Sequence, residues 1–352
     1  MPVDPSLAVL SNNLMTIAIA VYALAMLAYA AEMAFGRPRT SRQAEDVETR
    51  SRQRESVLVG ADRGTHPPAA GDTPVGGRRT GGVRESERTD PTILPTIPVG
   101  VIGGIAVALT VLGWGLHVAE IVTRGLAAGR LPWGNMYEFT SVLAFAAVTA
   151  YLVLLARQRV RFLGLFVMIP VVLGLGLDVT VLYTSAGPLG PALQSYWLGI
   201  HVTAAVTAAG IFMVASVATA LYVVVDQHER RTASGGTAAL SRLARKLPTT
   251  DVLDRVAYRT IAFGFPIWTF AVIAGAIWAG SAWGKFWGWD PKEVWALITW
   301  LIYAAYLHAR STAGWRGRKA AYIALLGFAA WLFNYFVINI FVHGMHSYAG
   351  LG

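Results

Sequence analysis

The stretch WGKFWGWDPKEVWALITWLIYAAYLH, residues 283–308, holds five tryptophans in its first eighteen residues and continues as an apolar segment. Its Asp-Pro-Lys-Glu step predicts the start of a helix. Asp290 can accept hydrogen bonds from free backbone N–H groups, Pro291 suits the first helical position, and Glu293 can complete a capping box. The pattern therefore predicts an aromatic surface that is fixed to the rigid end of a helix.

The composition around this stretch is that of a membrane protein. The chain of 352 residues is 55% hydrophobic and only 14% charged, whereas soluble domains have about 25% charged residues. Several apolar runs reach the roughly 20 residues that cross a bilayer. We therefore expect an all-α, polytopic membrane protein. The absence of cysteine excludes disulfides, thiolate metal sites and any thioether bond made by this chain itself.

Eight segments are expected to cross the membrane as helices. They are residues 12–33, 95–120, 136–156, 162–183, 198–226, 260–280, 293–309 and 319–342, with a short surface helix within the polar stretch 228–258.

The expected organisation has three parts. Residues 1–35 hold a first helix, which is too long and lacks the basic start of a signal peptide, so we expect it to be retained. Residues 36–94 are rich in Arg, Glu, Gly, Ser and Thr and have almost no aromatics, which predicts a disordered linker. Residues 95–352 form the main transmembrane domain, with the tryptophan-rich loop at 281–293.

The basic residues predict the orientation. All 29 Lys and Arg residues except Arg124, Arg130, Lys285 and Lys292 fall in segments on one side of this topology. Basic loops favour the cytoplasmic side, so we expect the linker 36–94 to be cytoplasmic. Both termini and the tryptophan-rich loop are then expected on the outer side. Orientation explains the net charge of +9, and no nucleic-acid partner is implied.

Five of the seven histidines lie at or inside the expected spans, where an ionisable side chain is costly and often functional. His201 begins the fifth span, and His343 and His346 follow the eighth, so the topology brings them to the side of the tryptophan-rich loop. Imidazole suits haem iron, which takes one axial ligand on each face. An outer haem site is thus one hypothesis. An aromatic belt with water-exposed histidines is the alternative.

His308 and His117 are expected at opposite depths, so we predict that they do not share one iron. Counting about 1.5 Å per residue along the helix places His308 near the inner side of the membrane. A haem there would need a second ligand from another polypeptide, with His228 as the only internal candidate. The alternative for His308 is a hydrogen bond to a carbonyl or a lipid headgroup. The alternative for His117 is a polar role at the outer boundary.

Several motifs together resemble one known family. WGKFWGWDPKE resembles the WWD signature of haem-handling proteins. The segments ALQSYWLGIHV, YLHAR, GMHSYAG and RLPWGNMYEF lie elsewhere in the chain. With them, the chain resembles the CcsA/ResC family of system II cytochrome c biogenesis, over about residues 95–352.

This resemblance implies haem b as the cofactor and assigns roles to particular residues. The family's outer haem ligands match His201 and His346, and its intramembrane histidine matches His308. The haem platform matches Trp283, Trp287, Trp289 and Asp290 of the WWD loop. Further candidates are His117, His343, which could substitute as a ligand, Trp295, and the Asn135, Tyr137 and Glu138 motif, whose role would be structural or haem-adjacent.

The resemblance also implies a reaction and partners. Haem passes outward, is held between His201 and His346, and is attached to an apocytochrome c whose Cys-x-x-Cys-His thiols add to the vinyl groups. A CcsB/ResB-type membrane subunit would supply the partner of His308, and a thiol reductant system would serve the acceptor. The chain would be the catalytic part of a holocytochrome c synthase in a bacterial plasma membrane. The alternatives are a haem exporter without ligation activity and a di-haem, cytochrome b-like electron-transfer subunit.

Overall fold

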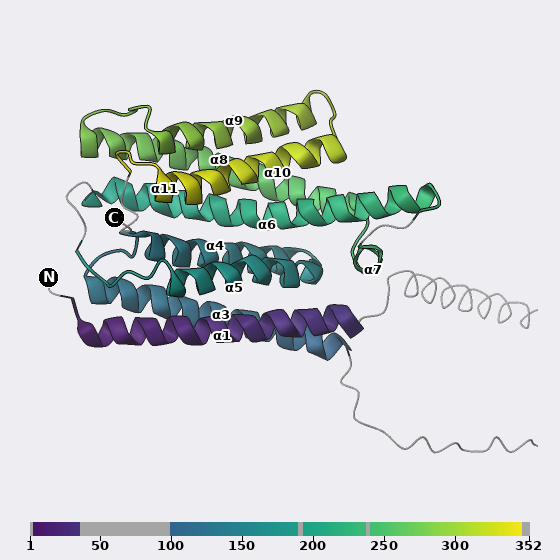
Figure 1. Cartoon of the computed structure of the whole chain (residues 1–352), viewed down its shortest axis with the longest axis horizontal. Coiled ribbons are helices and arrows are strands. Elements are labelled where there is room, and N and C mark those ends of the chain that lie inside the picture. Colours follow the sequence, from purple (N-terminus) through teal and green to yellow (C-terminus); the bar gives the residue numbers. More distant parts are fainter. Residues whose placement is uncertain (1–2, 36–98, 189–192, 237–239, 347–352) are drawn as a thin grey trace, which may run out of the picture. The chain divides into compact units, whose positions relative to one another are not determined.

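The computed structural model describes residues 3–35, 99–188, 193–236 and 240–346 (Figure 1). The described residues form helices and no strand, which confirms the expected all-α class. The expected disordered linker, residues 36–94, lies outside the described residues.

Seven helical segments of the described chain are long and apolar enough to cross a membrane. The bounds of the helices that make them up are α1 (Pro5–Phe35), α3 (Val99–Ala128), α4 (Met136–Arg157), α5 (Gly164–Thr180), which follows the short η1 (Arg161–Leu163), α6 (Tyr196–Ala233), α8 (Thr250–Trp283), and α10 (Arg318–Leu332) with its continuation through η3 (Phe333–Ile338) and α11 (Asn339–Phe341).

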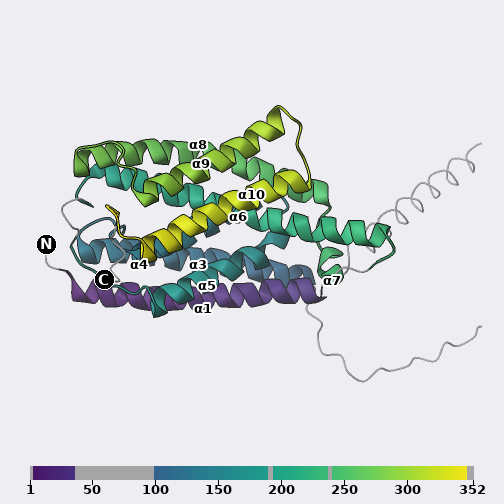
Figure 2. The ribbon, with the colours of Figure 1, turned by 45° about the horizontal axis from the view of Figure 1, so that its top comes forward.

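The seventh expected span also forms a helix, α9 (Pro291–Ser311), although it is not among those seven. It is 21 residues long and packs against α8 and α10, so it belongs to the same bundle (Figures 1 and 2). A short helix, α7 (Ser241–Ala244), lies in the polar stretch where a surface helix is expected.

Helix α6 is the central element of the bundle, because it packs against α4, α8 and α10. Its apolar window is 72% buried, the largest share among the candidate spans. On one side of it lie α4 and α5, with α1 and α3 beyond, and on the other side lie α8, α9 and α10 (Figures 1 and 2). Gly210 makes the α4 contact close: a Cβ there would lie 2.6 Å from the backbone nitrogen of Ala147. Small residues allow such close approach of helices in membranes.

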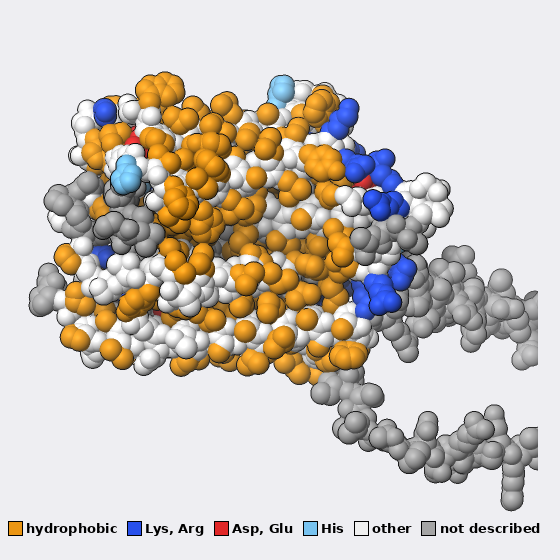
Figure 3. All heavy atoms as spheres, in the orientation of Figure 1, with side chains coloured by type: hydrophobic (Ala, Val, Ile, Leu, Met, Phe, Trp, Pro, Cys, Tyr) orange, Lys and Arg blue, Asp and Glu red, His pale blue; other side chains and the backbone are white. Residues whose placement is uncertain are grey.

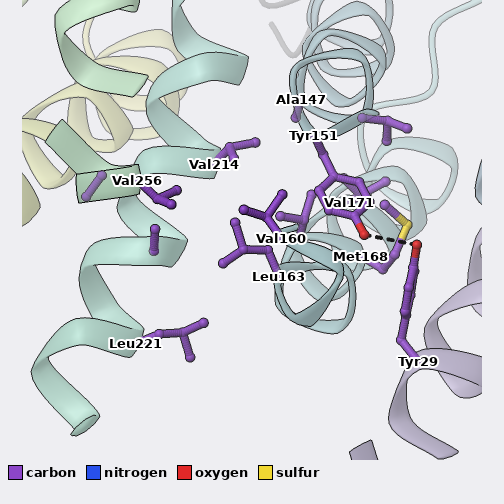
Figure 4. Packing of buried hydrophobic residues seen from close by; sticks show 14 of the residues in the cluster. Tyr29, Ala147, Tyr151, Val160, Leu163, Met168, Val171, Val214, Leu221 and Val256 are labelled. Carbon is purple, nitrogen blue, oxygen red and sulfur yellow. Dashed lines mark hydrogen bonds between the residues drawn. The ribbon is translucent and has the colours of Figure 1, made fainter. Parts of the chain in front are cut away.

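The packed interior between α1, α4, α5 and α6 contains both apolar and hydroxyl-bearing side chains. Leu163, Met168 and Tyr151 are fully buried in it (Figure 4). The Tyr151 hydroxyl donates a hydrogen bond of 3.0 Å to the Tyr29 hydroxyl of α1. A hydroxyl buried among apolar groups needs such a partner, because an unpaired one is costly to remove from water.

The two ends of the bundle differ in charge. The starts of α6 and α9 and the ends of α8 and α11 lie at one end (Figure 1). Lys and Arg side chains gather near the other end, where α6 finishes, and hydrophobic side chains cover the face between (Figure 3). Ion pairs at this basic end include Arg310–Asp254 at 2.6 Å and Arg161–Glu32 at 2.5 Å. Such an unequal distribution of Lys and Arg between the two ends is typical of helical membrane proteins.

Candidate functional site

A cavity opens between α6, α8, α9 and the last span, at the end that carries the tryptophan-rich loop. About 160 Å³ of it can be reached by the centres of water molecules, which is far more than one water needs. Its walls are mostly apolar and aromatic, with a few polar groups among them. The lining includes Phe139, Leu198, Trp268, Trp278, Trp287, Trp331 and Tyr335, with His201, Lys292, Glu293, Asn334, Asn339 and His346 as polar or charged members.

His201 lies in the second turn of α6 and reaches across to α8. Its Nδ1 lies 2.8 Å from the carbonyl oxygen of Ala271, which can only accept, so Nδ1 carries the proton. The lone pair of the imidazole is therefore on Nε2. The ring is parallel to the indole of Trp278, with ring centroids 6.0 Å apart and 12° between the planes. A backbone carbonyl on Nδ1 is the contact that commonly orients a metal-binding histidine.

His346 follows the last helix and returns to the same cavity. Its Nδ1 lies 2.9 Å from Oδ2 of Asp290, and its ring meets the indoles of Trp283 and Trp278 edge-on at 4.7 and 5.6 Å. Burial, followed by the positive charge of Lys292, lowers the pKa of His346 to about 4, although the Asp290 carboxylate opposes this. The imidazole is therefore neutral at physiological pH, as a metal ligand must be.

Asp290 joins the tryptophan-rich loop to the C-terminal segment. Its side chain accepts from the backbone N–H of Lys292, and Glu293 accepts from the N–H of Asp290, which confirms the expected capping box. The other oxygen, Oδ1, accepts from the Met345 N–H at 2.7 Å. One carboxylate thus starts helix α9 and also anchors the segment that carries His346.

Trp278 lies between the two histidines and was not predicted from sequence as a site residue. It is 1% exposed and contacts the rings of both His201 and His346. The available signal was the spacing of Ala271, Gly275 and Trp278 at i, i+4 and i+7, which puts two small residues and an indole on one helix face.

The expected tryptophan platform is only partly on the cavity. Trp287 lines the cavity, and Trp283 contacts Trp278 at 4.9 Å in addition to His346. Trp289 is 72% exposed and meets Trp287 at right angles, with a positive φ of 56° that is rare for a bulky residue. Trp295 packs on Phe333 at 4.2 Å and does not line the cavity.

Three other candidate histidines lie away from the cavity. His343 is exposed beyond the last helix. His117 is buried between α1, α3 and α4, with Nε2 3.1 Å from the Ser141 hydroxyl and Nδ1 3.4 Å from the Tyr22 hydroxyl. Both ring nitrogens of His117 therefore have hydrogen-bonding partners within the bundle, away from the cavity. His308 is exposed on α9, one turn before the end of that helix.

The Asn135, Tyr137 and Glu138 motif organises the start of α4. Asn135 accepts from the Glu138 N–H as the helix cap. The buried Glu138 carboxylate pairs with Arg124 at 3.1 Å and Arg130 at 2.7 Å. Tyr137 is buried beneath the Arg124 guanidinium. None of these three side chains lines the cavity, whereas the next residue, Phe139, does.

The fold is that of a polytopic helical membrane protein. At one end of its bundle, two histidines line a cavity and contact the same tryptophan ring. A family model described as cytochrome C assembly protein matches residues 133–346. The CcsA cytochrome c biogenesis protein of Microcystis aeruginosa is 35% identical over 299 residues, covering 72% of this chain and 89% of that protein. The CcsA proteins of Crocosphaera subtropica and Guillardia theta are 36% and 37% identical, over 73% and 65% of this chain and 89% and 80% of their own lengths.

The chain therefore belongs to the cytochrome c assembly protein family, as a member of its CcsA branch.

Proposed function

We propose that this chain holds haem b between His201 and His346 and supports its covalent attachment to apocytochrome c. The observation that carries the proposal is that both imidazoles contact the same buried indole, Trp278. They come from positions 145 residues apart in the chain, and both line one cavity. Its aromatic walls suit a flat, apolar macrocycle.

The donor set fits haem iron. Each Nδ1 is engaged, by the Ala271 carbonyl for His201 and by the Asp290 carboxylate for His346. Such contacts hold a ring in one tautomer and make Nε2 a better ligand. Two neutral imidazoles are an established ligand set for iron. The Asp290 carboxylate would fix the orientation of the His346 ring.

The chain's own contribution to attachment would be positioning. It has no cysteine, so both thiols must come from the acceptor's Cys-x-x-Cys-His segment. Each thiol would add across one vinyl group, its sulfur bonding to one vinyl carbon and its hydrogen going to the other. Holding the substrate in one orientation converts this into an effectively unimolecular encounter. A thiol reductant system would keep the acceptor's cysteines available.

The proposed orientation puts the cavity end, both termini and the WWD loop on the outer face of a bacterial plasma membrane. The clustering of Lys and Arg at the opposite end supports this orientation (Figure 3). His308 is exposed toward that basic end, away from the cavity. We propose that it binds a second haem together with a histidine of a CcsB/ResB-type subunit.

The optical spectrum of the detergent-purified protein tests the outer site. We expect a bis-imidazole haem spectrum that is lost in His201→Gln and in His346→Gln. His343→Gln is the matched control, because that histidine is exposed and should leave the spectrum unchanged. An unchanged spectrum in the first two variants would overturn the ligand assignment.

Reconstitution separates attachment from export. The chain, its partner subunit, haem and a reduced apocytochrome c are combined, and covalent haem is detected after denaturation. Covalent haem that depends on His201 supports the proposal, whereas bound but never attached haem would indicate an exporter. A di-haem electron carrier is disfavoured, because among the described residues only His201 and His346 form a pair facing one cavity.

A further inference from the structure

Among the described residues, Lys292 in the first turn of α9 is the one lysine or arginine that lines the cavity. Its side chain is mostly buried, and its Nζ donates to the amide oxygen Oδ1 of Asn339. Asn339 is itself held in place, because its Nδ2 donates to the Tyr335 carbonyl at 2.8 Å. The ammonium is thus fixed against the wall by a neutral amide. An ammonium has three donors, so this bond leaves capacity for another acceptor.

Lys292 has no carboxylate partner within the described chain, unlike three arginines that are also largely removed from water. Arg124 and Arg130 pair with Glu138, and Arg310 pairs with Asp254. Lys292 makes no ion pair within the described residues. Lys246 shares this lack of an ion pair, but it donates to the backbone carbonyls of Met33 and Ala34 and lies away from the cavity. A buried ammonium without an anion is costly, because the amide does not replace the hydration that the charge has lost.

The carboxylates near Lys292 are already engaged by other groups. Glu293 accepts the backbone N–H groups of Gly288 and Asp290 at 2.8 and 3.1 Å. Asp290 accepts from the backbone of Lys292 and Met345 and from the ring of His346. Neither carboxylate forms an ion pair with the ammonium, although the charge of Asp290 attracts it from a distance. A carboxylate on a molecule in the cavity would supply the direct ion pair that the described chain does not.

We propose that Lys292 is a carboxylate-binding site of this cavity and that it binds a propionate group of haem. This inference rests on the proposed function, because it needs haem in the cavity that His201 and His346 line. Haem carries both of its propionates on one edge of the macrocycle, and they are its only ionised groups apart from the iron. A fixed cation in an apolar wall would recognise that edge and no other.

This contact would fix the orientation of the haem macrocycle in the cavity. Two imidazoles on the iron leave the macrocycle free to rotate about the axis that joins them. A propionate held at Lys292 removes this freedom and fixes the opposite edge, which carries the vinyl groups. Lys292 would therefore be a positioning residue for attachment, and its loss would affect which edge is presented rather than iron ligation itself.

The test compares haem with haem dimethyl ester, which has the same iron and vinyl groups but no ionised carboxylates. Both are titrated into the full chain purified with its partner, with the bis-imidazole spectrum as readout. We expect the wild type to bind haem about tenfold more tightly than the ester, which corresponds to about 1.4 kcal/mol. Lys292→Met should abolish this preference by weakening haem binding while leaving ester binding within about threefold. Lys292→Arg should retain most of the preference.

Lys285→Met is the control, because that lysine lies in the same loop but is exposed. Lys285→Met should keep the wild-type ratio of haem affinity to ester affinity. Effects of detergent on the ester are the same for all variants, so they cancel when these ratios are compared. If the wild type bound haem and the ester with equal affinity, the inference would be overturned. This comparison uses the wild type alone and does not depend on whether a variant folds. A wild-type ratio in Lys292→Met would also overturn the inference, while the two-histidine site would stand. If neither ligand gives a bis-imidazole spectrum in the wild type, the proposed function itself fails, and the propionate site fails with it.

Discussion

Gly275 of α8 lies directly against the imidazole of His201 of α6. A Cβ built on Gly275 would lie 2.8 Å from both Nδ1 and Cε1 of that ring, which is closer than van der Waals contact allows. The same ring must keep Nδ1 at 2.8 Å from the Ala271 carbonyl, one turn earlier on α8. The missing side chain at 275 is therefore what allows the histidine to point into the cavity with its proton on Nδ1.

Gly275→Ala should displace the His201 ring and weaken haem binding while keeping the fold, since the group that must move is the end of a side chain. We expect about a tenfold loss of haem affinity and a weaker bis-imidazole spectrum. Gly174→Ala is the matched control, because a Cβ there meets nothing within 4 Å. Equal affinities for the two variants would contradict the positioning role of Gly275.

Asp290→Ala should affect both the start of α9 and the placement of His346. Loss of the cap alone is expected to cost about 1 kcal/mol of stability, seen as a lower unfolding midpoint in detergent. Haem affinity should fall further than this, because the Met345 N–H and the His346 ring lose their acceptor. Asp251→Ala, an exposed acid in the first turn of α8, is the control and should leave haem binding intact. Unaltered haem binding in Asp290→Ala would show that the Asp290 carboxylate is not needed to position His346 for haem.

The stability of the haem-free protein should fall as the pH drops from about 6.5 to about 4. The pKa of His346 is lowered by burial to about 4 in the folded state, from an ordinary value of 6.5. Between these values the unfolded chain binds more protons, so acid favours unfolding, by an amount on the order of 3 kcal/mol. Unfolding midpoints measured across this window in His346→Gln should depend less on pH. His343→Gln should show the same pH dependence as the wild type. If His346→Gln and His343→Gln depended equally on pH, a buried neutral imidazole at His346 would be contradicted.

Glu138→Gln should destabilise the whole bundle rather than alter the cavity. The Arg124 side chain is 1% exposed, so removal of the negative charge leaves a buried guanidinium without its partner. Breaking such a pair typically costs about 3–5 kcal/mol. Thermal unfolding in detergent checks this, with Glu229→Gln as control because that carboxylate is exposed. A loss of less than about 1 kcal/mol would mean that the pair contributes little.

The features that were predictable from sequence are those with a local or topological cause. The capping box depends on residues 290–293 alone, and the meeting of His201 with His346 follows from counting spans and assigning basic loops. Hydropathy is the weakest guide for α9, whose polar first turn and basic last turn flank the apolar part.

The features that were missed depend on contacts between helices. Spacing shows that Trp278 shares a face with Gly275, but it does not show that this face meets His201. Lys292 was interpreted only as one of the few basic residues on the outer side, because nothing local predicts that its ammonium turns into the cavity. The same limit applies to His117, whose hydrogen-bonding partners Tyr22 and Ser141 come from two other helices.

The hydrogen bond from the Met345 N–H to Asp290 can form only after the C-terminal segment has been synthesised. A ribosome makes the tryptophan-rich loop more than fifty residues before it makes the segment that pins this carboxylate. During that interval the nascent chain already holds His201 and the indoles but lacks the second imidazole. A chain that stopped before residue 345 would therefore lack both the N–H that binds Asp290 and the second imidazole of the proposed haem site.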